Sequence, residues 1–156
     1  MNGKAAFIIG SETDRNLIES SRKYFEYFNI EMDLRVISAH RNPDEVKIFA
    51  SSARENGYQV LIGAAGMAAH LAGALKAHST LPVIGVPLPG GIEGGMDALL
   101  ATVQMPKGVP VATMGVGKSG AINAAILCAE IFALSDSKIL KKLLKFKKSG
   151  CVISET

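Results

Sequence analysis

Five short apolar runs alternate along this chain with segments of helical periodicity, and this alternation is the strongest constraint on its fold. Each run is continuously apolar instead of alternating with polar residues, as expected for strands that helices cover on both faces. Strands separated by helices favour a parallel sheet between two helical layers, an α/β architecture. The predicted strands are residues 5–9, 33–37, 60–64, 83–86 and 111–114.

Helices are predicted between and after these strands. The first repeats apolar and small residues at helical spacing from Leu17 to Phe28. The second begins at Asn42-Pro43, because asparagine is a favoured N-cap and proline suits the first helical position, and Gly57 would end it in the left-handed conformation. Further helices are predicted at residues 67–77, 96–102, 119–134 and about 136–148.

Length and charge limit the possible classes of function. A chain of 156 residues has the length of one domain, which we place at residues 1–156. The formal net charge is +3, but six of the 17 basic residues lie in the last twenty positions, in an amphipathic helix whose apolar side carries Ile139, Leu140, Leu143 and Leu144. A nucleic-acid-binding domain spreads its basic face over the fold, and no apolar run approaches the ~18–20 residues of a membrane span. We therefore expect neither nucleic acid nor membrane as a partner.

Cysteine usage and the N-terminal sequence indicate the compartment. Cys128 and Cys151 are too few for a disulfide framework or a zinc site, and Cys128 lies in an apolar segment that predicts a buried thiol. The first residues lead directly into a strand and show no signal-peptide pattern. We expect a cytoplasmic protein, and no spacing of His, Cys or Glu residues suggests a metal site.

Glycines and small polar residues follow each predicted strand. Because the carboxyl ends of parallel strands lie at one edge of a sheet, where open α/β folds bind their ligands, these turns are expected to form the functional site. They comprise residues 10–14, 38–41, 63–66, 87–91 and 115–120.

Ser11, Thr13 and Asp14 follow the first strand and open the first helix. Hydroxyl groups beside the free N–H groups of a helix N-terminus can bind an anion, and a neighbouring carboxylate can accept hydrogen bonds from ribose hydroxyls. The same residues would also form an ordinary N-cap cluster. These residues alone leave both interpretations open.

His40 and Arg41 follow the second strand in the turn Ser38-Ala39-His40-Arg41. An imidazole titrates near neutral pH and is the natural proton carrier, whereas a guanidinium is suited to gripping phosphate. Together they predict a site where a phosphorylated substrate exchanges a proton with the protein.

His70 follows the third strand in Gly66-Met67-Ala68-Ala69-His70-Leu71. The small residues around it would let the backbone approach a flat ligand closely. A histidine packed within its helix is the alternative interpretation of His70. His78 lies at the opposite end of the same helix and is predicted to be exposed.

Two nucleotide-binding patterns near the C-terminal half are incomplete. The glycines of residues 115–120 spell G-x-G-x-x-G, but the dinucleotide fingerprint needs a following strand that ends in an acid, and Asp136 follows a helix. The same segment resembles half of a phosphate-binding P-loop, but Ala112 stands where the first glycine belongs. The sequence therefore favours neither class.

Taken together, several motifs resemble the N5-carboxyaminoimidazole ribonucleotide mutase family of purine biosynthesis, the small catalytic subunit of phosphoribosylaminoimidazole carboxylase. The resemblance covers roughly residues 5–134 and is specific in combination. It rests on Gly10-Ser11-Glu12-Thr13-Asp14, Ser38-Ala39-His40-Arg41-Asn42-Pro43, Gly66-Met67-Ala68-Ala69-His70-Leu71, Gln104-Met105-Pro106 and Gly117-Lys118-Ser119-Gly120.

This resemblance implies a three-layer α/β/α flavodoxin-like fold with a five-stranded parallel sheet, a homo-octamer, and no metal or organic cofactor. It implies an isomerase that moves a carboxylate from N5 to ring carbon 4, with His40 as general acid/base, and possible coupling to the ATP-dependent synthase that makes the carbamate. The implied substrate-binding residues are Ser11, Thr13, Asp14, Ser38, Ala39, Arg41, Gly66, Ala68, His70 and Leu71.

The sequence departs from the family pattern in a few places, and other functions stay open. Thr13 replaces a usual serine, Met67 a usual glycine and Ala72 a usual proline, and the turn Leu88–Gly95 is atypical. A carboxylase that uses free CO₂ is the alternative within the family. A flavin-binding module or a receiver domain would share the fold, but a receiver needs an aspartate where Gly63-Ala64 stands.

Overall fold

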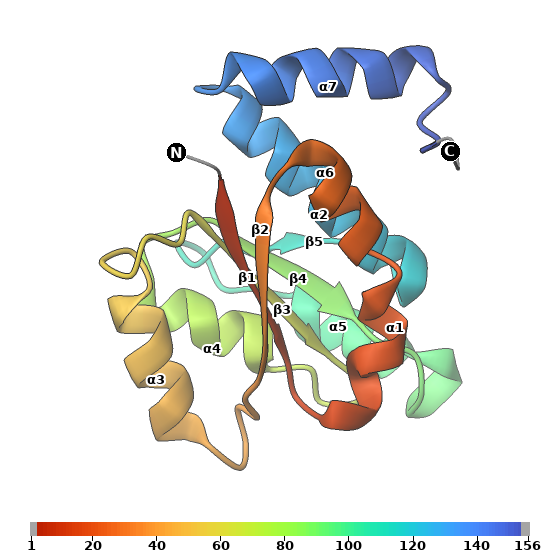
Figure 1. Ribbon diagram of the computed structural model, residues 1–156. Coiled ribbons are helices and arrows are strands. Elements are labelled where there is room, and N and C mark those ends of the chain that lie inside the picture. Colours follow the sequence, from red (N-terminus) through yellow and green to blue (C-terminus); the bar gives the residue numbers. More distant parts are fainter. Residues whose placement is uncertain (1–2, 154–156) are drawn as a thin grey trace.

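The computed structural model describes residues 3–153 and forms one parallel five-stranded sheet between two layers of helices (Figure 1). The strand order is β2-β1-β3-β4-β5. The strands are β1 (Lys4–Ile9), β2 (Glu31–Val36), β3 (Val60–Ala65), β4 (Val83–Pro87) and β5 (Ala112–Thr113). The predicted fold class, a three-layer α/β/α flavodoxin-like fold, is confirmed. The outermost positions of the predicted domain, 1–2 and 154–156, lie outside the described residues.

Each face of the sheet has its own helices. One face carries α1 (Arg15–Glu19), α2 (Arg22–Phe28) and α6 (Lys118–Ala133), and α7 (Ser137–Lys148) packs across α6 and α2. The other face carries α3 (Pro43–Ser52), α4 (Leu71–His78) and α5 (Met96–Val103). Two short 3₁₀ turns, η1 (Glu12–Asp14) and η2 (Ile92–Gly94), lie in the loops after β1 and β4.

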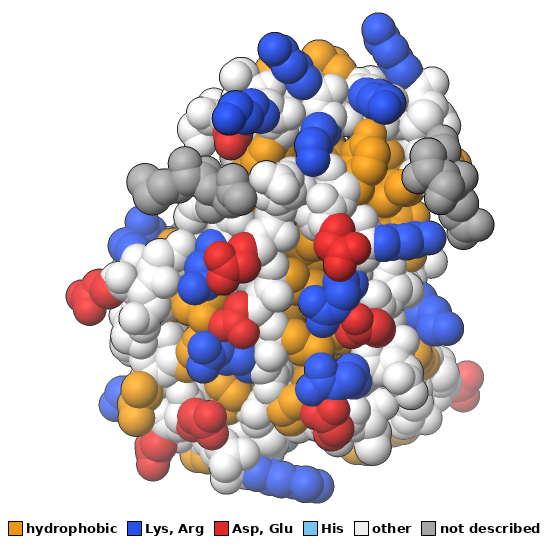
Figure 2. Space-filling view, viewed as in Figure 1, with side chains coloured by type: hydrophobic (Ala, Val, Ile, Leu, Met, Phe, Trp, Pro, Cys, Tyr) orange, Lys and Arg blue, Asp and Glu red, His pale blue; other side chains and the backbone are white. Residues whose placement is uncertain are grey.

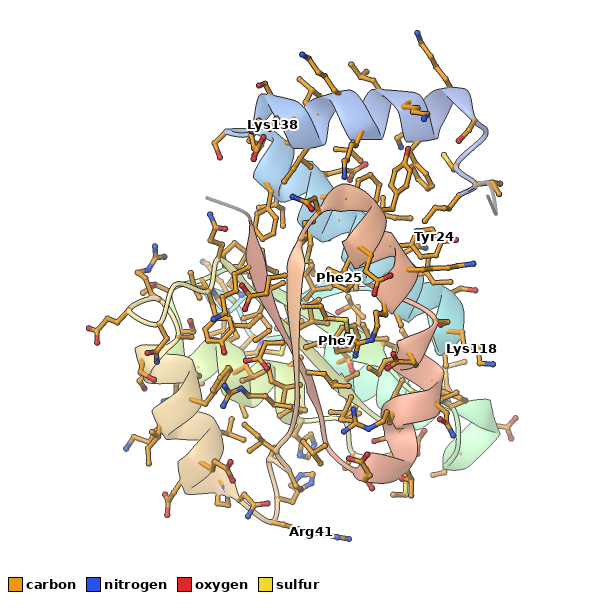
Figure 3. All side chains as sticks on the ribbon, in the orientation of Figure 1. Phe7, Tyr24, Phe25, Arg41, Lys118 and Lys138 are labelled. Atoms are coloured by element: carbon orange, nitrogen blue, oxygen red, sulfur yellow. The ribbon has the colours of Figure 1, made fainter. Side chains whose placement is uncertain are left out.

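Strand β1 shows why the inner strands are apolar without interruption, whereas the edge strand β2 carries Asp33 and Arg35, so the prediction of a continuous apolar run was wrong there. Phe7 and Ile9 are fully buried on the side of α1, α2 and α6, whereas Ile8 is fully buried on the opposite side. The Phe7 ring meets the Phe25 ring of α2 edge to face, with centroids 6.4 Å apart (Figure 3). Because alternate side chains enter two cores, no position from Ala5 to Ile9 is free to be polar.

The first predicted helix is wrong as a single element. It is divided into η1, α1 and α2, with the break at Ser20-Ser21. The buried Ser21 hydroxyl donates to the Ile18 carbonyl at 2.6 Å, and Ser20 donates to the Leu17 carbonyl. Serine hydroxyls compete with backbone N–H groups for such carbonyls, so the helix is interrupted there.

Other element boundaries also differ from the prediction. Helix α4 begins at Leu71 instead of residue 67, because Met67 has a left-handed backbone and tight turns follow it. Strand β2 spans residues 31–36 instead of 33–37, and β5 is shorter than predicted. Pro43 does open α3, but the Asn42 side chain makes no capping bond, and Gly57, left-handed as predicted, lies five residues after the helix ends.

The terminal helix α7 packs with a different apolar face from the predicted one. Asp136 caps it by accepting from the Lys138 backbone N–H at 2.8 Å. Ile139 and Leu143 are buried together with Phe146, whereas Leu140 and Leu144 are 44% and 56% exposed. Lysines gather over α7, and acidic and basic side chains intersperse on the face around β2 (Figure 2).

Two smaller predictions concern burial. Cys128 is fully buried, as predicted, and this burial raises the pKa of its thiol. His78 is exposed, as predicted. Within residues 3–153, no helix combines the length and the apolar character needed to cross a membrane.

Gly63 gives a test of how closely α4 packs on the sheet. A Cβ atom at Gly63 would lie 2.9 Å from the backbone Cα of Ala72, so Gly63→Ala must push α4 away from β3. We expect a loss of about 1–3 kcal/mol in the free energy of unfolding, measured by urea denaturation. Gly115→Ala is the control, because a Cβ at Gly115 meets nothing within 4 Å. Equal stabilities of the two variants would contradict this packing.

Candidate functional site

A cleft of about 360 Å³ opens at the carboxyl edge of the sheet, where the loops after β1, β2, β3 and β4 meet. The parallel register explains this convergence, since Ile9 at the end of β1 lies opposite Val36 and Ala64, and Ala65 lies opposite Pro87. The structure places all the predicted site residues in the cleft lining: Ser11, Thr13, Asp14, Ser38, Ala39, His40, Arg41, Gly66, Ala68, His70 and Leu71. Their roles remain predictions at this point.

His40 and His70 form a direct hydrogen bond across the cleft. Nε2 of His40 lies 2.8 Å from Nδ1 of His70, and the two rings meet at 75° with centroids 4.9 Å apart. One ring must donate and the other accept, so the tautomers of the two imidazoles are coupled. The bond leaves Nδ1 of His40 and Nε2 of His70 available to a ligand. Thirty positions separate the two residues, and the sequence did not predict this pair.

The loop after β1 is ordered by its own side chains. The Ser11 hydroxyl accepts from the Thr13 backbone N–H at 3.3 Å and lies 2.9 Å from the Thr13 hydroxyl. Ser11 is therefore the N-cap of η1, as the plainer of the two sequence interpretations held. Burial raises the pKa of Asp14, although a hydrogen bond with the Ser11 backbone opposes part of the rise. A half-buried carboxylate at the cleft wall is thus held at a cost that a bound partner could relieve.

The loop after β2 presents the cationic group of the site. The Ser38 hydroxyl accepts from the Arg41 backbone N–H at 3.2 Å and closes the turn that carries His40. The Arg41 side chain extends from the tip of this loop away from the body of the molecule (Figure 3). Within residues 3–153 it forms no ion pair, so its guanidinium is available to an anion at the mouth of the cleft.

The cleft also contains residues that were not named as substrate-binding, most of them within the turns predicted to form the site: Gly10, Ala65 at the end of β3, Met67, Pro89, Gly90 and Gly91. The predicted turn at residues 115–120 does not line this cleft, so that part of the prediction was wrong. Gly91 adopts φ +63°, and a Cβ atom there would lie 2.2 Å from a carboxylate oxygen of Asp97. The same carboxylate accepts from the Ile92 backbone N–H at 3.1 Å. The glycine turn predicted at residues 87–91 was the sequence signal for this wall of the cleft.

A second, larger cleft of about 450 Å³ lies between α3 and the edge strand β2. Two of its polar groups are already engaged, since Arg35 and Tyr58 both donate hydrogen bonds to the neighbouring Asp33. Burial opposes ionisation of Asp33, but these two bonds outweigh it and lower the pKa of the carboxyl. We therefore assign function to the smaller cleft, where ring nitrogens and a guanidinium are free.

No group of three or more His, Cys, Asp or Glu side chains among residues 3–153 is arranged to hold a metal ion. The donor groups of the cleft are two imidazoles, hydroxyls, one carboxylate and one guanidinium. Groups of these kinds are suited to binding a polyhydroxylated or phosphorylated molecule and to moving a proton.

Comparisons with known proteins agree on one family. A family model described as "AIR carboxylase" matches residues 4–150. The N5-carboxyaminoimidazole ribonucleotide mutase of Escherichia coli (strain K12) is 43% identical over 146 residues, which cover 94% of this chain and 86% of the relative. The protein of the same name from Bacillus subtilis (strain 168) is 44% identical over 143 residues, covering 92% of this chain and 88% of the relative.

Two further likenesses are more distant or partial. A chloroplastic phosphoribosylaminoimidazole carboxylase of Vigna aconitifolia is 40% identical over 142 residues, but these cover only 25% of its length. The crystal structure of Treponema denticola PurE superposes with a TM-score of 0.86 at 24% identity, covering 96% of this chain and 92% of that one. The structural likeness shows the shared fold.

The raised pKa of Asp14 generates a prediction on stability. The folded protein binds a proton at Asp14 more readily than the unfolded chain does. The ionised Asp14 therefore lowers the free energy of unfolding once the pH rises above 3.8, the ordinary pKa of an aspartate. We expect Asp14→Asn to raise the free energy of unfolding slightly at pH 7, because water screens much of the cost, and to have no effect well below pH 3.8.

Asp44→Asn is the matched control for this measurement. Asp44 is exposed in the first turn of α3, where a carboxylate favours the helix, so its removal is expected to lower stability at pH 7. Chemical denaturation of both variants at pH 7 and pH 3 checks the pair. A loss of stability in Asp14→Asn at pH 7 would contradict the assignment.

Proposed function

Because the chain belongs to the AIR carboxylase family, we propose that it is an N5-carboxyaminoimidazole ribonucleotide mutase of purine biosynthesis. This isomerase moves a carboxylate from N5 to ring carbon 4 of aminoimidazole ribonucleotide. Relatives with the mutase name align over nearly their whole length, whereas this chain spans 25% of the plant carboxylase. The observation that carries the proposal in the structure is the pair of hydrogen-bonded imidazoles in a cleft at the carboxyl edge of the sheet.

The chemistry requires little more than a proton carrier and a closed space. The N5–carboxylate bond breaks, N5 takes up a proton, and CO₂ is released within the cleft. The electron-rich ring carbon then attacks CO₂ and gives up its own proton. Since the ring carbon is nucleophilic by itself, no metal or organic cofactor is needed. Holding CO₂ and the ring together supplies proximity and prevents escape.

His40 is the general acid/base in this proposal. It lies in the cleft on a loop tip, and an imidazole can carry a proton between N5 and ring carbon 4 at neutral pH. His70 acts on His40 through the 2.8 Å bond, which fixes the orientation and tautomer of the catalytic ring. This role is additional to the part of His70 in lining the base pocket.

The remaining cleft residues bind the ribonucleotide. Ser11, Thr13 and Asp14 face the ribose and phosphate, with the Asp14 carboxylate accepting from ribose hydroxyls. The Arg41 guanidinium, unpaired within residues 3–153, binds the phosphate. The base lies against Ser38, Ala39, Gly66 and Ala68 of the loops after β2 and β3 and against Leu71 at the start of α4.

Self-association is part of the proposal. Met96, Leu100 and Val103 form a stripe at helical spacing on α5 and are 48%, 53% and 47% exposed. The stripe carries no charge that would select an acidic or basic partner, whereas a second copy of the chain offers the same apolar face about a symmetry axis. We propose that copies meet through α5 in a homo-octamer, as the family resemblance implies.

Further expectations belong to this proposal. Residues 1–156 act as a single domain in the cytoplasm, with no nucleic acid or membrane as partner. The unstable carbamate comes from an ATP-dependent synthase that works in functional coupling with this chain. A carboxylase that uses free CO₂ is the second candidate, and initial rates with carbamate against aminoimidazole ribonucleotide at controlled bicarbonate separate the two. Faster product formation from free CO₂ would reject the mutase.

Removal of the His40 imidazole tests the catalytic role. We expect His40→Asn to lower kcat by about 10²–10⁴-fold while binding of the ribonucleotide changes little, because the proton carrier is lost and the phosphate contacts remain. Turnover of the carbamate and calorimetric binding of the product measure the two effects. The control is His78→Asn, which removes an exposed imidazole at the far end of α4. Near-normal turnover of His40→Asn would exclude it as the proton carrier.

The same assay separates positioning from binding at His70. His70→Leu removes the bond to His40 and is expected to lower kcat more than it raises KM. His70→Asn offers an amide atom near the position of Nδ1 and is expected to recover part of the loss. Equal defects in both variants would contradict a positioning role.

Charge on α5 tests self-association. We expect Leu100→Asp to lower the mass of the assembly in light scattering, because a carboxylate in the apolar stripe must be desolvated at the interface. Leu134→Asp is the control, since Leu134 is 88% exposed at the end of α6, outside the stripe. An unchanged mass for Leu100→Asp would place the interface elsewhere.

A further inference from the structure

Met67 occupies an unfavourable backbone conformation at the wall of the cleft. Its φ is +49°, in the left-handed region that glycine adopts without penalty and that an unbranched side chain adopts with strain. Its side chain lines the same cleft as His40 and His70, and the residue is 64% exposed. The chain thus keeps a large apolar side chain where glycine would be easier to accommodate.

The turn that contains Met67 accounts for the conformation but not for the side chain. The Met67 carbonyl accepts from the Ala69 N–H at 2.9 Å, and the Ala68 carbonyl accepts from the His70 N–H at 2.8 Å. These bonds place His70 immediately before α4, within reach of His40. They use backbone atoms alone, so the turn would form equally well with glycine at position 67.

Packing does not compensate for the strain either. The Met67 side chain is 64% exposed and buries little apolar surface, whereas the core residues of the sheet are fully buried. Strained residues that packing does not explain are concentrated at functional sites. Of the four non-glycine residues with positive φ among residues 3–153, Met67 is the one that lines the cleft, so its side chain is placed to act on a bound molecule.

The surroundings of Met67 indicate that use. The other residues of the loop after β3 that line the cleft ahead of His70, namely Ala65, Gly66 and Ala68, are small and give no bulk to close it. Carbon dioxide carries no charge, so no ion pair can retain it, and apolar cover is well suited to keeping it beside the ring. Methionine is apolar and unbranched with three rotatable bonds, which suits a side chain that folds over a small neutral molecule.

We propose that Met67 caps the cleft during the reaction, so that the CO₂ freed from N5 is retained until ring carbon 4 attacks it. The inference rests on the proposed mutase function. It assigns to Met67 control over the fraction of freed CO₂ that reaches ring carbon 4 of the same substrate molecule. Breaking of the N5–carboxylate bond does not require the cap. Loss of the cap leaves cleavage intact but lets CO₂ escape before the new carbon–carbon bond forms. Aminoimidazole ribonucleotide is then released without its carboxylate.

Isotope retention measures the cap directly. Carbamate labelled with ¹³C in its carboxylate is converted in unlabelled bicarbonate with carbonic anhydrase present, and the product is weighed by mass spectrometry after subtraction of a protein-free blank. We expect Met67→Gly to lose a fraction of label about threefold or more above that of the unsubstituted protein, because CO₂ exchanges with solution. Met67→Leu keeps the apolar bulk and is expected to retain the label.

Cys151→Gly is the control for relief of backbone strain. Cys151 is exposed beyond α7 and has φ +62°, so glycine relieves a similar left-handed strain away from the cleft. Thermal midpoints are expected to rise in both glycine variants, while label loss rises only in Met67→Gly. Retention of label by an active Met67→Gly protein, equal to that of the unsubstituted protein, would overturn the proposal.

The remaining outcomes are also decisive. If Met67→Gly forms no product but consumes carbamate and releases aminoimidazole ribonucleotide, the cap is supported. If the folded variant consumes no carbamate, Met67 is needed for cleavage and the cap is rejected. Failure of the unsubstituted protein to form any ring-carboxylated product would reject the mutase function itself, which is a separate result.

Discussion

The parallel alignment of five strands is the constraint on which the rest of the structure depends. Every strand ends at the same edge, so the loops after β1, β2, β3 and β4 meet although they are far apart in the chain. The two apolar cores hold this alignment from both faces, with Phe7 in one and Ile8 in the other. Polar side chains are thereby largely excluded from the inner strands, although the edge strand β2 keeps Asp33 and Arg35, and the polar groups of the cleft gather in the loops at the carboxyl edge.

The cleft combines a rigid frame with groups that remain unsatisfied. Backbone turns fix the positions of His40 and His70, and their 2.8 Å bond couples the two rings. Around them, a half-buried Asp14 and a strained Met67 each carry a cost in the folded protein. Such costs are typical of sites where a ligand completes the interactions.

Continuous apolar runs and glycine-rich turns were sufficient to predict the sheet and its functional edge, because burial on both faces leaves a simple signature. Helix breaks were not predictable in the same way. The division at Ser20-Ser21 depends on serine hydroxyls that donate to backbone carbonyls instead of to water. The late start of α4 depends on the left-handed backbone of Met67. The pairing of His40 with His70 depends on loop geometry across three strands, which spacing along the chain does not encode.

The most direct test of the site is a crystal structure of the protein with the ring-carboxylated ribonucleotide bound. We expect ring carbon 4 within about 3–3.5 Å of an imidazole nitrogen of His40, the phosphate beside Arg41 and the His40–His70 bond intact. A ligand whose ring carbon faces away from His40, with no rotation of the imidazole able to reach it, would contradict the proton-transfer role on which the proposed function depends.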